Sequence, residues 1–203
     1  MLKRRFWYTL TAALSRKKRA VNEFDQTSAI MFQFSHPRNP WFFSFFIAAS
    51  FAMVGAALFF QYYHEDLPCE LCVYVRAWLL GIGVLAIVGL LVRQWRWPAL
   101  LVIVLMLWLT LGLAEDTWVL LSIDQGWPTS GACSFVAFFP EWMPLDKWWP
   151  QMFEVQNLCQ PTPVVLLGIS MAHALSAASA VYGVLLIVGA VQIAMPRLLK
   201  SDQ

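Results

Sequence analysis

The chain contains four cysteines, Cys69, Cys72, Cys133 and Cys159. The first two form a C-x-x-C motif, and the second two lie 26 positions apart, in a later loop. A C-x-x-C disulfide closes a very small ring, so it removes little entropy from the unfolded chain and is a poor structural staple. Such a pair is instead a common redox element. The spacing therefore favours thiol–disulfide exchange at all four cysteines.

A single arginine accompanies the first pair. Arg76 follows Cys72 by four residues, so the two side chains share one face of a helix. If that helix reaches back to Cys69, all three side chains form one stripe. A charge inside an apolar segment is costly and marks a functional site. We expect Arg76 to stabilise a thiolate or the oxygen of an electron acceptor; the alternative is that it snorkels towards lipid headgroups.

Two other readings of the cysteines stay open. The four residues can form two inert structural disulfides, or they can bind a metal in a membrane protein. A zinc site usually has a second close pair of ligands, and Cys133 and Cys159 are not close in sequence. No metal site is therefore predicted.

The composition predicts that these residues sit in a membrane protein. Apolar residues make up 60% of the chain and charged residues 13%, whereas soluble chains are about 45–50% apolar and about 25% charged. The net charge is only +2, which argues against a nucleic-acid-binding protein. The sequence thus predicts an all-α membrane protein with one bundle of helices in a lipid bilayer.

Four segments are long and apolar enough to cross the hydrocarbon, which takes about 20 residues. A basic arm is predicted over residues 1–39, the helical domain over 40–196 and a tail over 197–203. The predicted spans are residues 41–63, 73–92, 97–114 and 164–194. The third span is expected to end at Glu115 and Asp116.

The basic residues predict the orientation of these spans. Eight of the fourteen Lys and Arg precede residue 40, and others lie between the second and third spans and in the tail. The loops that carry the cysteines contain only Lys147. Because cytoplasmic segments are enriched in Lys and Arg, both termini are expected in the cytoplasm and all four cysteines outside.

The second outer loop is rich in tryptophan and proline. Residues 146–153 are expected to form a short helix at the membrane interface, where tryptophan is favoured, and Pro150 limits its length. This helix lies between Cys133 and Cys159 in the sequence. This helix would hold the segment that carries Cys133 and Cys159 close to the membrane surface.

With these motifs in place, the chain resembles the bacterial DsbB family of quinone-dependent thiol oxidases. The resemblance rests on Cys69-Glu70-Leu71-Cys72-Val73-Tyr74 with Arg76, and on the run 139–148 (FPEWMPLDKW) in the second outer loop. Four spans and the cysteine spacings also agree, over roughly residues 41–196.

The resemblance implies a function and a location. A reduced DsbA-like thiol oxidase of the periplasm attacks a Cys133–Cys159 disulfide at Cys133, and the released Cys159 attacks Cys69. Cys72 then faces a membrane quinone, ubiquinone or menaquinone, in a site with Arg76 and Glu115. The resemblance also implies the bacterial inner membrane, with the cysteine loops in the periplasm.

The chain departs from the family pattern in three places. The N-terminal arm is long, Asp116 follows Glu115 where the family often has histidine, and Pro163-Val164 replaces an aromatic residue. These departures leave open a DsbI-like branch, which serves one dedicated thiol oxidase.

Overall fold

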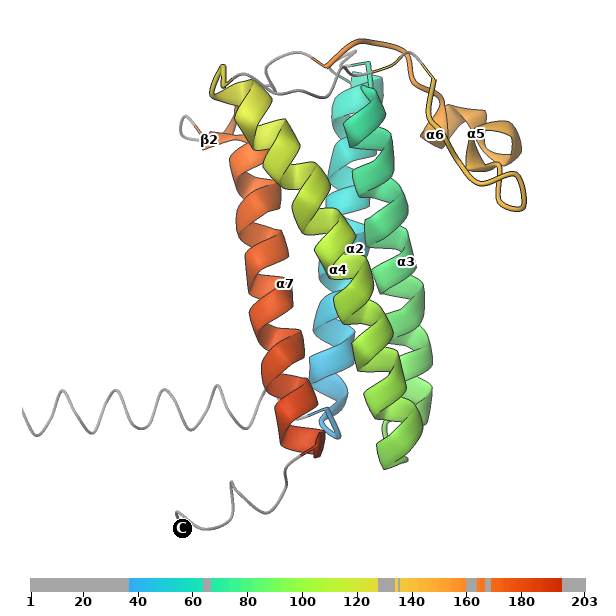
Figure 1. The fold of residues 1–203 in the computed structure, drawn as a ribbon, viewed down its shortest axis with the longest axis vertical. Coiled ribbons are helices and arrows are strands. Elements are labelled where there is room, and N and C mark those ends of the chain that lie inside the picture. The colour runs from blue at the N-terminus through green and yellow to red at the C-terminus, as the bar shows by residue number, and fades with distance from the viewer. Residues whose placement is uncertain are drawn as a thin grey trace, which may run out of the picture. The chain divides into compact units, whose positions relative to one another are not determined.

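The protein is a bundle of four long helices. The computed structural model describes residues 37–63, 67–127, 134, 136–159, 164–166 and 169–194. The four helices lie side by side (Figure 1), and each is long and apolar enough to cross a membrane. The predicted four-helix membrane bundle is therefore confirmed. The helices are α2 (Pro40–Tyr63), α3 (Glu70–Val92), α4 (Arg96–Asp124) and α7 (Met171–Ala194).

Some predictions concern other parts of the chain. Most of the N-terminal arm, the C-terminal tail and Cys133 lie outside the described residues.

Helix α2 covers the predicted first span, and α3 begins three residues before the predicted second span.

An aromatic cluster fills the core towards the end of the bundle where α2 begins. Phe42, Phe43 and Phe46 on α2 are buried, and the ring of Tyr182 from α7 packs edge-on against Phe46 at 4.9 Å between centroids. Gly89 on α3 lets the Phe43 ring approach the helix backbone, because a Cβ at that position would collide with the ring. These side chains join α2 to α3 and to α7 and hold the helices that carry the site at their other end.

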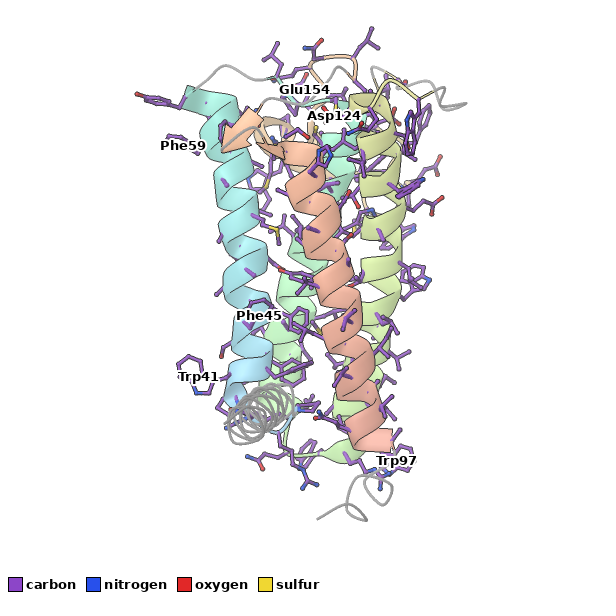
Figure 2. All side chains as sticks on the ribbon, turned by 90° about the vertical axis from the view of Figure 1, so that its left-hand side faces the viewer. Trp41, Phe45, Phe59, Trp97, Asp124 and Glu154 are labelled. Atoms are coloured by element: carbon purple, nitrogen blue, oxygen red, sulfur yellow. The ribbon has the colours of Figure 1, made fainter. Side chains whose placement is uncertain are left out.

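The surface of the bundle is apolar along its length. Large side chains such as Phe51, Leu111 and Val184 are exposed on α2, α4 and α7. Trp41 and Trp97 lie at one end of the bundle, and Asp124 and Glu154 lie at the opposite end (Figure 2). A bilayer supplies the solvent that this surface requires.

The third span is longer than predicted. Helix α4 has 29 residues, which is about 43 Å, and it passes through Glu115 and Asp116 without a break. The prediction ended the helix there because charges are unfavourable in lipid. Asp116 is instead accommodated by a hydrogen bond from Trp78 Nε1 at 2.7 Å. The helix ends only before Gly126, whose φ of +70° is left-handed.

The fourth span begins later than predicted. Strand β1 (Val164–Leu166) pairs antiparallel with β2 (Ile169–Ser170), and α7 follows directly. A short apolar run does not distinguish strand from helix in the sequence. The Ser170 hydroxyl donates to Asp124 Oδ2 at 2.6 Å and lies 2.7 Å from His173 Nδ1. Side-chain bonds of this kind favour a helix start over a helix interior.

The second outer loop contains the predicted short helical segment in two pieces. Helices α5 (Leu145–Trp148) and α6 (Pro150–Phe153) are four residues each and are separated by Trp149. The break follows from Pro150, because a residue that precedes proline is driven out of the helical region, and Trp149 has φ −140° and ψ 69°. Figure 1 shows both pieces beside α3, towards the end of the bundle where α3 begins. Phe153 is buried there with Val73 of α3.

Candidate functional site

The first cysteine pair lies at the start of α3. Cys69 is the N-cap residue, and its Sγ accepts a hydrogen bond from the Cys72 N–H at 3.4 Å. Both cysteines are free thiols, with their sulfur atoms 2.8 Å apart. The helix therefore starts one residue after Cys69, as the stripe of Cys69, Cys72 and Arg76 requires. The first turn of a helix presents free N–H groups and a positive dipole end, both of which stabilise a thiolate.

The two thiols are not equivalent. The hydrogen bond with the Cys72 thiol raises the pKa of Cys69 above the value of 9.0 for a free cysteine, and burial raises it further. Cys69 is only 6% exposed. Cys69 therefore holds its proton more firmly than a free cysteine does.

Arg76 lies one turn further along α3 and is buried, with 4% of its surface exposed. Its Nη1 donates to Gln61 Oε1 at 2.7 Å and to the Met152 carbonyl at 3.1 Å. Its Nε is buried and has no hydrogen-bond partner among the described residues. Two bonds thus fix the guanidinium, while the Nε donor remains for an acceptor that the described residues do not supply. This arrangement contradicts snorkelling, which would expose the charge.

A cavity of about 80 Å³ opens beside Cys72 and Arg76. All four long helices contribute to its walls, which are apolar apart from these two side chains. The remaining lining residues are Met53, Ala57, Phe60, Leu67, Pro68, Val75, Leu79, Leu120, Met171 and Leu175. The unbonded Nε of Arg76 requires an oxygen acceptor, and a quinone carbonyl on an apolar ring meets that need. The chemistry of the lining residues therefore fits a quinone.

The cavity is smaller than the roughly 150 Å³ that holds benzene in an engineered site. A quinone ring therefore enters only if wall side chains move. Met53 and Met171 are suited to this, because methionine is unbranched and adapts to irregular shapes.

The segment before Cys159 is attached next to the first pair. The N–H groups of Gln156 and Asn157 both donate to the Pro68 carbonyl, at 3.0 and 3.3 Å, and Pro68 directly precedes Cys69. Cys159 is disulfide-bonded, and it packs against the buried cluster that contains Cys69. Three of the four cysteines thus lie at one end of the bundle, and the fourth, Cys133, is outside the described residues.

Glu115 is not brought to this site. Its side chain is exposed on α4, and the α4 residue that lines the cavity is Leu120. Five helical positions separate the two, which turns their side chains about 140° apart. Asp116 is also elsewhere, because it accepts the Trp78 hydrogen bond at the α3–α4 contact.

Gln61 is a site residue that the sequence analysis missed. It is buried near the end of α2, where its Oε1 accepts from Arg76 and its Nε2 donates to the Gln151 carbonyl at 3.4 Å. The only signal in the sequence is an amide inside an otherwise apolar span, which is unusual in a membrane helix. The contact of Arg76 with Met152 leaves no signal, because 76 positions separate the two residues.

The sequence is similar to known proteins of one family. The family model described as "Disulfide bond formation protein DsbB" matches residues 38–189. The "Disulfide bond formation protein B" of Shewanella frigidimarina (strain NCIMB 400) is 33% identical over 165 residues, which are 75% of this chain and 89% of that protein.

Two further relatives carry related names. The protein of Shewanella loihica (strain ATCC BAA-1088 / PV-4) is 30% identical over 169 residues, 81% of this chain and 95% of its own length. "Disulfide bond formation protein B 2" of Pseudomonas aeruginosa is 35% identical over 124 residues, 59% of this chain and 72% of its own length.

Proposed function

Because the chain belongs to the DsbB family and is a disulfide-forming membrane oxidoreductase, we propose that it reoxidises a DsbA-like thiol oxidase and passes the electrons to a membrane quinone. The observation that carries this proposal is the cavity shared by Cys72 and Arg76. The sulfur of Cys72 and a buried guanidinium with one unbonded donor line one apolar space inside a membrane bundle. No purely structural disulfide needs that arrangement.

The orientation follows from charge. Arg93 and Arg96 lie at the junction of α3 and α4, at the end of the bundle that carries Trp97, while Asp124 and Glu154 lie at the opposite end (Figure 2). We place the basic end in the cytoplasm of a bacterial cell and the cysteine end in the periplasm, across the inner membrane. The N-terminal basic arm then meets the anionic inner leaflet.

Electrons enter through the second cysteine pair. A thiolate of the reduced partner attacks the Cys133–Cys159 disulfide at Cys133, which forms a mixed disulfide and releases Cys159 as a thiolate. The pairing is supported by the disulfide-bonded state of Cys159 and by the free state of Cys69 and Cys72.

Cys159 then attacks Cys69 of the oxidised first pair. The Cys69–Cys72 bond breaks, a Cys69–Cys159 bond forms, and Cys72 leaves as a thiolate. The attachment of Gln156 and Asn157 to the Pro68 carbonyl supports this choice of target, because it keeps the Cys159 segment beside Cys69. The release of Cys72 as a thiolate is favoured because Cys72 lies in the first turn of the helix, one turn from the Arg76 guanidinium.

Arg76 and Cys72 would hold the quinone, with Gln61 fixing the arginine. A quinone bound there would supply the two-electron oxidation. When Cys69 is released from Cys159 as a thiolate, it closes again on Cys72, and the two electrons of the pair would go to that acceptor. The two protons needed to form a quinol would balance those that the partner's dithiol loses to solvent. The protein keeps water out of this step with the apolar walls of the cavity.

The acceptor is required on energetic grounds. A DsbA-type partner has a potential near −120 mV, and about 30 mV is worth 1.4 kcal/mol in a two-electron couple. An ordinary structural disulfide, below about −300 mV, is too weak an oxidant for such a partner. The quinone supplies the thermodynamic driving force, and the chain positions the reacting groups and stabilises the thiolates.

Trapping of the partner tests the entry step. In a Cys159→Ala variant, Cys133 is a free thiol that can attack the disulfide of the oxidised partner, and the thiol of Cys159 that would displace the partner is absent. We therefore expect a covalent complex with one periplasmic protein after rapid acid quenching and thiol blocking. Mass spectrometry identifies that protein and distinguishes a general DsbA from a dedicated oxidase. A Cys133→Ala/Cys159→Ala double variant is the control. Recovery of the same complex from the double variant would show that Cys133 is not the point of attack.

A further inference from the structure

The loop that follows Cys133 is attached to α3 by hydrogen bonds from two backbone groups. The Ser134 N–H donates to Glu70 Oε2 at 2.6 Å, and the Phe138 N–H donates to the Tyr74 hydroxyl oxygen at 2.7 Å. The Tyr74 hydroxyl in turn donates to Glu70 Oε1 at 3.1 Å. These two side chains and two N–H groups form one connected set, which we call the loop clamp. One carboxylate accepts two of its three hydrogen bonds, and bonds to a charged group are the stronger kind.

Apolar contacts close over the loop clamp. The ring of Phe139 packs edge-on against Tyr74 at 5.7 Å and against Phe153 of α6 at 6.0 Å between centroids. Ala137 is buried in the same small cluster as Val73 and Phe153. The segment is therefore held by packing as well as by polar groups.

The place of the loop clamp is specific. Glu70 lies between Cys69 and Cys72 in the sequence, and Ser134 directly follows Cys133. The segment before Cys159 is attached to Pro68. The two segments that flank the second cysteine pair are thus attached at positions 68 and 70, one on each side of Cys69. Attachment of this kind keeps the two loops close together, so each cysteine has a high effective concentration at the others.

We propose that Glu70 and Tyr74 are positioning residues for the step that regenerates the second disulfide. This inference rests on the proposed function. After Cys159 has bonded to Cys69, the partner is still joined to Cys133 in the mixed disulfide. The second thiol of the partner attacks the partner sulfur of that bond, which releases oxidised partner and a Cys133 thiolate. Cys133 then attacks Cys159: the Cys133–Cys159 bond forms, the Cys69–Cys159 bond breaks, and Cys69 leaves with the electron pair. The loop clamp keeps the Cys133 segment in place for this attack.

The test follows the disulfide that this step consumes. We expect Glu70→Ala and Tyr74→Phe to slow quinone-coupled oxidation of a reduced DsbA-type protein about tenfold, the size expected from loss of hydrogen bonds to a charged group. The Cys69–Cys159 disulfide should accumulate during turnover, as measured by mass spectrometry of peptides from non-reduced protein. Glu70→Gln keeps one acceptor oxygen and should have a smaller effect. Glu141→Gln, an exposed carboxylate of the same loop, should match the unmodified protein.

A bypass separates positioning from damage to the first pair. In a Cys133→Ser/Cys159→Ser background, dithiothreitol reduces Cys69–Cys72 directly, and addition of Glu70→Ala or Tyr74→Phe should leave that quinone reduction unchanged. An equal loss in the bypass, or turnover without accumulation of Cys69–Cys159, would overturn the positioning role. Failure of the unmodified protein to oxidise the partner would instead overturn the proposed function.

Discussion

Replacement of Cys72 by serine is expected to reduce quinone reduction by the partner to the rate seen without protein. Serine cannot form or leave a disulfide, so the sulfur that faces the Arg76 cavity is lost and no electron reaches the acceptor. The measurement is quinone absorbance under anaerobic conditions, with reduced partner in excess. This is the largest effect that the mechanism predicts for a single substitution.

The same variant carries an internal check. Cys69 and Cys159 remain, so Cys72→Ser protein with an intact second disulfide should still react with the partner once. Circular dichroism should give an unchanged helix content, because the serine keeps the place of Cys72 in the first turn of α3. Turnover at the unmodified rate would remove Cys72 from the electron path.

Replacement of Arg76 by alanine is expected to raise the KM for quinone about 10- to 100-fold. The buried guanidinium offers its unbonded Nε to the acceptor, and loss of a hydrogen bond to a charged group costs about 1.5–3 kcal/mol. The measurement is quinone reduction at saturating partner over a range of quinone concentrations. Attack of the partner on Cys133 does not involve this residue, so the KM for partner should not change.

Two matched variants sharpen this prediction. Gln61→Leu removes the acceptor that holds Arg76 Nη1 and should raise the quinone KM by a smaller factor. Arg93→Ala removes an arginine from the other end of α3, about 25 Å away, and should leave the KM unchanged. An Arg76→Ala protein with the quinone KM of the unmodified protein would exclude Arg76 from the acceptor site.

The positions of the spans could be predicted because lipid imposes one rule on every segment. Apolar length predicts the bounds of α2 and α3 to within three residues, since no competing structure satisfies the backbone in hydrocarbon. The ends of α4 and α7 depend on contacts that hydropathy does not contain. Trp78 accommodates Asp116 within α4, and the contact of Ser170 with Asp124 precedes the start of α7.

The residues of the candidate site likewise divide into those that the sequence predicts and those whose positions depend on packing. Cys69, Cys72 and Arg76 could be predicted as a group because helical spacing on one short segment brings them together. Gln61 and the Met152 carbonyl reach Arg76 from other elements, so their positions depend on how the helices and the loop pack. Glu115 was predicted at the site only through the family resemblance, and its side chain is exposed on α4, about 140° around the helix from Leu120, which lines the cavity.

The most direct test of the electron path is its stoichiometry. Purified protein in lipid vesicles, with reduced partner and a known amount of quinone and without oxygen, should convert one quinone to quinol for each disulfide formed in the partner. Both products can be counted in one sample, by thiol titration and by chromatography of the quinone. Partner disulfides that appear without loss of quinone would contradict the account.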